Sequence, residues 1–311
     1  MKRGIDLWTY KEEENFIKTT DAIIYTIISC EKCNYRYRAL FRKSRPTRCP
    51  RCNGSLRSNT PQNRNAPVAN YTEKFVLKLI NKALDILDEY KNFEAKREVV
   101  CNELDLTSGS AADIAIVEKG NNDRIYKPNQ IKLIFEVKMS LVWNWEPDKN
   151  GKPKIESDYD RHRGRGSIYR TDSILKAIGK GAILRSHFEA NKIPYVVIGN
   201  CPPPPNYISK IDGSVRAGIV QKFISVNPNP LQVDKSNSKE RNPKKSKGGG
   251  FLRIDTQNEL SLFIKSFLEK EQVFIGSMLE KEKLGEIIKS LDLTKDLAEI
   301  GEDFFKKIYE A

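Results

Sequence analysis

The chain has 311 residues, enough for two domains or for one core with a smaller satellite. It carries 54 Lys and Arg against 41 Asp and Glu, a formal net charge of +13, which favours a polyanionic partner such as a nucleic acid. With 39% hydrophobic residues and 6 cysteines, the composition excludes wholesale disorder and a disulfide scaffold. Its apolar runs are far shorter than the ~20 residues of a membrane span, and the basic N-terminus lacks an apolar signal core. We therefore expect a cytoplasmic protein that has no membrane partner.

Four cysteines near the N-terminus have the spacing of a structural zinc site. Cys30 and Cys33 form one pair, Cys49 and Cys52 form a second, and fifteen residues separate the pairs. Two such turns place four thiolates around one Zn²⁺ and fill its tetrahedral coordination, so the predicted metal is structural rather than catalytic. The alternative is four free thiols in a small core.

The segment between these cysteine pairs is strongly basic. From Cys30 to Cys52 the chain holds eight Lys and Arg against a single acidic residue, Glu31, and interleaves them with Tyr35, Tyr37 and Phe41. Basic groups suit phosphate contact, and exposed rings suit base stacking. We expect this ribbon to bind DNA; a scaffold with a solvated basic face is the alternative. The residues expected to contact DNA are Arg36, Arg38, Arg42 and Lys43.

The elements expected further along the chain favour an α/β core. Residues 55–69 are polar and predict a linker, and apolar residues at helical spacing predict a helix over 70–90. Further elements are strands at 97–104, 113–117, 131–138 and 194–199 and a helix over 172–190. The inward face of the second helix is expected to hold Ile174, Leu175, Ile178, Ala182 and Leu184. This alternation predicts an α/β core with a mixed sheet flanked by helices.

The remaining sequence predicts a basic loop followed by helices. Residues 227–250 are poor in hydrophobic residues and rich in Lys and Arg, which predicts a flexible loop. Helices are expected after capping boxes at Thr256 with Glu259 and at Ser277 with Glu280. The predicted organisation is an N-terminal region over 1–66 with its zinc ribbon at 30–54, a core over 67–226, the loop over 227–250, and a helical region over 251–311.

Two carboxylates and a lysine are predicted to meet on one face of the sheet. If the second and third predicted strands pair as an antiparallel hairpin with Val117 opposite Lys132, then Asp113 falls opposite Glu136. Lys138 shares the face of Glu136 because side chains alternate along a strand. Adjacent carboxylates repel and are stable mainly with a cation between them, and oxygen-rich open sites suit Mg²⁺. The alternative is a solvated strand end.

Such a site has the groups needed to hydrolyse a phosphodiester. Mg²⁺ between the carboxylates could activate water and neutralise charge on a phosphodiester oxygen, while Lys138 could hold or deprotonate the attacking water. A second Glu-x-Lys sequence, Glu94-Ala95-Lys96, is set aside because no apolar strand leads into it.

Ala112-Asp113, followed by Glu136-Val137-Lys138 at the end of an apolar strand, resembles the PD-(D/E)XK nuclease superfamily. The resemblance extends to the turn ahead of Ala112 and to the following helix and strand, and so covers about residues 70–200. Ala112 stands where the motif has proline. The resemblance implies a restriction-endonuclease-like mixed sheet flanked by helices. It also implies Mg²⁺-dependent hydrolysis with Asp113 and Glu136 as metal ligands and Lys138 as the water-positioning group.

The family often adds an upstream glutamate on a helix. Glu73 matches that role, but it also lies at the capping-box position of a helix that Asn70 would cap, and both interpretations stay open.

Within the superfamily, a free-standing chain with a basic accessory module looks most like a type II restriction endonuclease. That resemblance implies sequence-specific cleavage of double-stranded DNA by a homodimer, and a cognate DNA methyltransferase acting on the same site as a further partner. A basic segment soon after the third strand adds expected DNA contacts at Arg161, Arg163 and Arg165. Lys176 and Lys180 share one helix face, which suits either phosphate contact or solvation.

Two alternatives to a restriction enzyme stay open. One is a repair or junction-resolving nuclease that recognises DNA shape rather than sequence. The other is a non-catalytic zinc-ribbon DNA-binding regulator that carries an inactive nuclease-like fold.

Overall fold

A computed structural model of the chain describes residues 7–19, 25–40, 48–58, 62–120, 123–147, 152–157, 166–230, 242–269 and 281–310. The described helices are α1 (Tyr10–Thr19), α2 (Gln62–Asp85), α3 (Thr171–Leu184), α4 (Ile208–Arg216), α5 (Gln257–Leu268), α6 (Lys281–Lys289) and α7 (Leu297–Glu310). The described strands are β1 (Tyr25–Cys30), β2 (Arg36–Leu40), β3 (Leu56–Ser58), β4 (Phe93–Val99), β5 (Ala112–Glu118), β6 (Ile131–Val137), β7 (Asn144–Pro147), β8 (Pro153–Ser157), β9 (Tyr195–Gly199), β10 (Lys222–Ser225) and β11 (Phe251–Arg253). No described helix is both long and apolar enough to span a bilayer.

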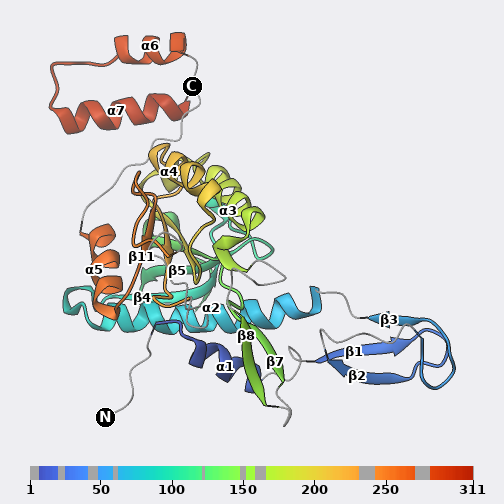
Figure 1. Cartoon of the computed structure of the whole chain (residues 1–311). Helices are drawn as coiled ribbons and strands as arrows, with labels where there is room; N and C mark the ends of the chain where they lie inside the picture. Colours follow the sequence, from blue (N-terminus) through green and yellow to red (C-terminus); the bar gives the residue numbers. More distant parts are fainter. Residues whose placement is uncertain are drawn as a thin grey trace.

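The body of the molecule is a six-stranded sheet with the strand order β11-β10-β9-β6-β5-β4 (Figure 1). Strands β4, β5 and β6 pair antiparallel, whereas β6, β9, β10 and β11 run parallel. The predicted mixed α/β sheet is therefore confirmed. A three-stranded sheet of β1, β2 and β3 extends to one side, and the α6–α7 hairpin lies beyond the opposite end of the body.

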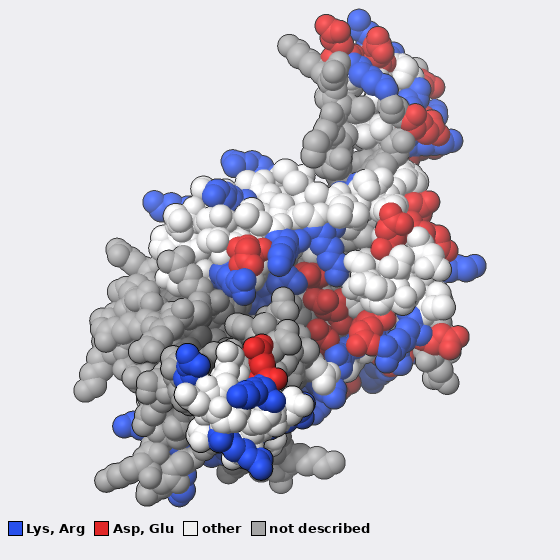
Figure 2. All heavy atoms as spheres, turned by 90° about the vertical axis from the view of Figure 1, so that its right-hand side faces the viewer, with Lys and Arg blue, Asp and Glu red and all other residues white. Residues whose placement is uncertain are grey.

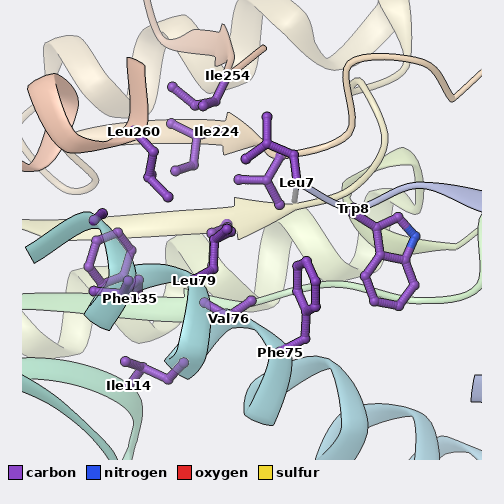
Figure 3. Packing of buried hydrophobic residues seen from close by; sticks show 14 of the residues in the cluster. Leu7, Trp8, Phe75, Val76, Leu79, Ile114, Phe135, Ile224, Ile254 and Leu260 are labelled. Atoms are coloured by element: carbon purple, nitrogen blue, oxygen red, sulfur yellow. The ribbon is translucent and has the colours of Figure 1, made fainter. Parts of the chain in front are cut away.

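Helices cover both faces of the six-stranded sheet. Residues of α2 and α5 pack in one hydrophobic cluster and residues of α3 and α4 in another. Figure 3 shows Phe75, Val76 and Leu79 of α2 beside Ile114 of β5 and Phe135 of β6. Because both faces are buried, the central strands are almost continuously apolar, and any charged side chain within them lies in a protected place.

The β5–β6 hairpin forms in the predicted register at the end that carries Asp113 and Glu136. Ile114 lies opposite Phe135, so Asp113 extends beside Glu136. The pairing of Val117 with Lys132 is wrong: Val117 faces Ile131 because a β-bulge interrupts the ladder after Ile116. The bulge takes up the extra residue at the loop end of the hairpin, which leaves the register at the other end unchanged.

The helix before the sheet starts earlier than predicted. Helix α2 begins at Gln62, so the predicted linker is wrong for residues 62–69, and the boundary predicted after residue 66 falls inside this helix. Pro67 lies inside this helix, in its second turn, where the missing N–H group removes one backbone hydrogen bond near the start of the helix. Strand β4 likewise begins at Phe93 rather than at residue 97, so Glu94 lies within a strand.

The body also extends further toward the C-terminus than predicted. Strand β11 pairs with β10, and Leu260 and Ile264 of α5 are buried in the cluster that α2 covers. Residues 251–269 therefore belong to the sheet body and not to a separate helical region. Thr256 caps α5 as predicted, because its hydroxyl accepts a hydrogen bond from the Glu259 N–H at 3.1 Å. The second predicted capping box, Ser277 with Glu280, lies outside the described residues.

The described parts of the predicted flexible loop are held in place. The Asp212 carboxylate of α4 accepts hydrogen bonds from the N–H groups of Gly248 at 3.0 Å and Gly250 at 2.8 Å. The prediction of a flexible loop is therefore wrong for residues 242–250, and residues 231–241 lie outside the described part of the chain. Helix α3 is also shorter than predicted and ends at Leu184; Leu175 is 51% exposed rather than inward.

Candidate metal centre and candidate active site

The four cysteines meet in a small N-terminal unit, the four-cysteine module, which comprises residues 25–40 and 48–58 with strands β1, β2 and β3. The Sγ atoms of Cys30 and Cys52 are 3.3 Å apart, those of Cys33 and Cys49 are 3.8 Å apart, and all four lie within 4.8 Å of one another. A tetrahedron with Zn–S bonds of about 2.3 Å has S···S edges of about 3.8 Å. The four cysteines could therefore hold a metal ion such as zinc.

Each cysteine pair is followed by an asparagine that shapes the turn. Asn34 and Asn53 have positive φ angles of 53° and 55°. Their N–H groups donate to the carbonyl oxygens of Cys30 at 3.0 Å and Cys49 at 2.9 Å. Asparagine tolerates this left-handed conformation better than most residues do. The repeated Cys-x2-Cys-Asn pattern is a local signal that the prediction from cysteine spacing did not use.

Gly54 lets the two turns approach each other. A Cβ atom at this position would lie 2.8 Å from the Lys32 Cβ atom and 3.2 Å from the Cys52 Sγ atom. The N–H group of Arg51 donates to the Cys49 Sγ atom at 3.4 Å. The module is thus shaped around its sulfur atoms by hydrogen bonds and by a residue without a side chain.

The predicted DNA contacts are only partly described. Arg36 is exposed on β2, and Arg38 lies in the same strand, where its backbone alone is described. Arg42, Lys43, Arg161, Arg163 and Arg165 lie outside the described residues. The Arg51 guanidinium lies 5.7 Å from the centre of the Tyr35 ring, which is 38% exposed. Figure 2, seen from the side of the module, shows Lys and Arg over its described surface. DNA contact stays a prediction.

The structure brings Asp113, Glu136 and Lys138 together on the face of the sheet that α3 covers. The Asp113 Oδ2 atom accepts a hydrogen bond from the Val137 N–H at 2.7 Å. The Glu136 side chain is 6% exposed, and its Oε1 atom pairs with the Lys138 ammonium. The hairpin register brings the two carboxylates together, and the alternation of β6 brings Lys138 to Glu136.

Lys180 of α3 is a fourth member of this cluster, and the prediction left its role undecided. Its Nζ atom lies 2.8 Å from Glu136 Oε2 and 3.9 Å from Asp113 Oδ1. Lys180 is three residues after the buried Ala177 and four before the buried Leu184. Helical periodicity therefore carried a signal that this lysine faces the sheet.

The surroundings give the two carboxyl groups different pKa values. Burial, reinforced by the negative charge of Glu136, raises the pKa of Asp113 to about 6, although Lys180 and Lys138 oppose the rise. Burial also acts to raise the pKa of Glu136, but its ion pairs with Lys138 and Lys180 lower it overall. Glu136 is thus held as a carboxylate, while Asp113 is the group that gains most from a further positive charge.

A cavity of about 360 Å³ opens beside Asp113. It is lined by Glu73, Glu98, Val100, Ser108, Gly109, Ser110, Ala111, Ala112, Asp113 and Arg124. Glu98 has a φ angle of 54° within β4, next to Asp113 across the strand pair, a conformation that is costly for a non-glycine residue in a strand. Such local strain is typical of functional sites.

Glu73 lines this cavity but does not cap α2. The helix begins eleven residues earlier, so the capping interpretation, with Asn70 as the cap, is wrong. The Glu73 carboxylate lies 2.6 Å from the Arg97 guanidinium, which neutralises it. A metal-site role for Glu73 stays a prediction.

The donor set of the carboxylate site fits a magnesium ion. Mg²⁺ is usually held by one or two carboxylates, with water in the remaining positions, and Asp113 and Glu136 supply two. Among the described residues, only the four cysteines form a group of three or more ligands close enough for one ion. A magnesium ion held by Asp113 and Glu136 would therefore leave its other coordination positions to water or substrate.

Comparison of the chain with known protein families, with curated proteins and with solved structures finds no match.

Proposed function

We propose that this protein is a Mg²⁺-dependent endonuclease that hydrolyses phosphodiester bonds of double-stranded DNA at specific sequences, in the manner of a type II restriction enzyme. The proposal depends on one observation: two carboxylates from neighbouring strands converge with Lys138 and Lys180 beside a cavity. The net charge of +13 supports a polyanionic substrate.

The arrangement of elements supports a restriction-endonuclease-like fold as part of this proposal. An antiparallel β4–β5–β6 unit is followed by α3 and by β9, which runs parallel to β6. Asp113 lies on the second strand of that unit, and Glu136 and Lys138 lie at the end of the third. These are the places that the resemblance to the PD-(D/E)XK superfamily implies.

In the proposed reaction, water adds to phosphorus and one P–O ester bond breaks, leaving a phosphomonoester and a free hydroxyl group. Asp113 and Glu136 would hold Mg²⁺, which supplies Lewis-acid stabilisation of the charge that develops on the phosphodiester. Lys138 lies on the same face and would orient the attacking water through its ammonium group. Burial of Glu136 keeps its carboxylate in one position, which favours an ordered site.

The four-cysteine module supplies the proposed DNA-binding surface. We propose that Zn²⁺ fills the four-cysteine site and that exposed basic residues such as Arg36 contact phosphates. A homodimer would place two active sites on the two strands of a palindromic site.

The proposal is tested by incubating the purified protein with unmodified phage DNA and Mg²⁺ and sequencing the fragment ends. Recurring end sequences would support a restriction enzyme, and nicks confined to branched or damaged DNA would support a repair nuclease instead. DNA binding that is indifferent to Mg²⁺, without cleavage of any substrate, would select the regulator.

A matched pair of variants ties any cleavage to the site. Glu136→Gln should abolish cleavage and leave DNA binding intact. Glu94→Gln, in the other Glu-x-Lys sequence, changes a carboxylate that is ion-paired with Lys96 at 3.1 Å in β4 and should leave cleavage unchanged. Full activity of Glu136→Gln would refute the site.

A further inference from the structure

The Lys180 side chain lies where a cation bound by the two carboxylates would be expected. Its ammonium group contacts Glu136 Oε2 at 2.8 Å, lies 3.9 Å from Asp113 Oδ1, and donates to the Ala111 carbonyl at 3.0 Å. Lys138, by contrast, is ion-paired with Glu136. Among the described lysines, Lys180 is the one within 4 Å of both carboxylates.

Both oxygens of the Glu136 carboxylate are already engaged. Lys138 pairs with Oε1 and Lys180 with Oε2. A divalent cation that bound this carboxylate would therefore have to replace one ammonium group. Lys180 is the group that it would replace, because only that ammonium lies between Glu136 and Asp113.

The charge balance of the cluster leads to the same exchange. The two carboxylates and two ammonium groups cancel, and the Glu136 and Lys180 side chains are only 6% and 23% exposed. A divalent cation added without loss of an ammonium would leave two excess positive charges in a poorly solvated place, which is unfavourable. Release of one lysine lowers that excess, and a DNA phosphate beside the site would lower it further.

The Lys180 side chain also has a direction in which it can move, toward the cavity beside Asp113. Its third partner, Ala111, belongs to the turn that lines the cavity beside Asp113. A lysine side chain is long and flexible, so it can turn from the carboxylates toward a substrate phosphate without a movement of α3.

We propose that Lys180 is a built-in counter-ion that occupies the cation position between Asp113 and Glu136 and is exchanged for the divalent cation, which frees it to contact the substrate phosphate. The inference rests on the proposed function for the identity of the site, and it adds a positioning residue that also controls cation affinity.

The test measures Mn²⁺ binding by calorimetry and by the shift in Tm, with the full-length zinc-loaded protein at slightly alkaline pH and without DNA. Lys180→Met should bind Mn²⁺ at least about tenfold more tightly than the wild type, because a competing positive charge within about 4 Å is gone. Lys176→Met, one turn away on the same helix and exposed, should bind like the wild type. Lys180→Arg keeps the competing charge and should not gain affinity.

The outcomes separate this inference from the proposed function. Unchanged or weaker Mn²⁺ binding by a folded Lys180→Met variant, or wild-type protein that binds no Mn²⁺ at the carboxylates, overturns the inference. Tighter binding by Lys180→Met that Asp113→Asn abolishes supports it, even if no DNA is cut. If DNA is cut but the affinity does not change, the nuclease stands and the exchange is wrong. Should Lys180→Met fail to fold, Lys180→Gln replaces it, with the same expected gain.

Discussion

In the four-cysteine module, Cys30 and Cys49 are the only buried residues among those whose exposure is described, whereas the six-stranded sheet is buried on both faces. The sheet is held together by apolar packing on each side, and the module has sulfur where a core would be. Units below about 40 residues rarely bury enough surface to fold without a metal or disulfides. The proposed zinc ion would thus be part of the scaffold of the module, whereas the proposed cation at Asp113 and Glu136 would bind to a sheet that folds without it.

The largest expected effect tests whether the four-cysteine module needs its metal to fold. Replacing Cys49 and Cys52 by Ser should remove zinc and unfold the module while the sheet stays folded, since structural zinc contributes about 10–16 kcal/mol of apparent binding free energy in small domains. Zinc content and hydrogen exchange of residues 25–58 measure the change. Cys101→Ala, a buried thiol of the sheet body, should retain zinc. Protected amides in the zinc-free module would contradict a structural metal.

The second effect concerns the carboxylate site of Asp113 and Glu136, where substitutions should abolish function while the protein stays folded. Asp113→Asn should lose both cation binding and cleavage. Lys138→Met should keep cation binding, but its cleavage rate should fall about 10²–10⁴-fold, which is the usual contribution of general acid–base catalysis. Single-turnover cleavage and calorimetry measure the two properties. Lys132→Met, in the same strand and paired with Glu118 at 2.8 Å, serves as the control with unchanged cleavage. Equal loss of cation binding in Lys138→Met would argue against separate roles.

A smaller effect tests how the N-terminal helix is attached to the sheet body. The buried Glu13 carboxylate of α1 accepts hydrogen bonds from the N–H groups of Val142 at 2.8 Å and Trp143 at 3.0 Å and from the Trp145 indole at 2.8 Å. Glu13→Gln would turn an amide NH₂ toward these donors and should destabilise the protein by about 2–4 kcal/mol.

Urea denaturation measures this change in the free energy of unfolding. Glu14→Gln alters a neighbouring residue that is ion-paired with Lys18 at 3.0 Å on the surface, and it should cost less than about 0.5 kcal/mol. A similar decrease in the free energy of unfolding in both variants would mean that the buried contacts of Glu13 stabilise the protein no more than the exposed ion pair of Glu14 does.

The smallest effect is a pH dependence of cation affinity and of stability, which arises from Asp113 in the carboxylate site. Because the pKa of Asp113 is raised to about 6, cation affinity should fall about tenfold for each pH unit below that value as the carboxyl group takes up a proton. Without a cation, the folded protein keeps a proton that unfolded Asp113 releases above its ordinary pKa, so stability should decrease as pH rises from about 4 to about 6.

Calorimetric Mn²⁺ titrations across this range measure the cation dependence, and urea denaturation measures the stability. Asp113→Asn removes the ionisable group and should abolish both trends. A flat affinity profile in the wild type would show that Asp113 is already ionised at low pH.

Some features of the molecule followed from local sequence. The cysteine spacing predicted the meeting of four thiols because each pair lies within a single tight turn. The pairing of Asp113 with Glu136 was predicted from an assumed hairpin register, and strand alternation, which has a fixed period of two, placed Lys138 on the face of Glu136. The same reasoning could not detect the bulge after Ile116, because a bulge changes pairing without changing composition.

Sequence by itself thus determined the sulfur cluster, the mixed α/β sheet and the three residues of the Glu-x-Lys hairpin site, since spacing along one or two neighbouring elements defines them. Tertiary structure alone decided that 251–269 completes the sheet body, that Glu73 pairs with Arg97, and that Lys180 reaches across from α3. These contacts join segments that are 24 or more residues apart. Their free energy comes from burial and charge pairing between distant elements, and no local periodicity encodes which distant partner will be met.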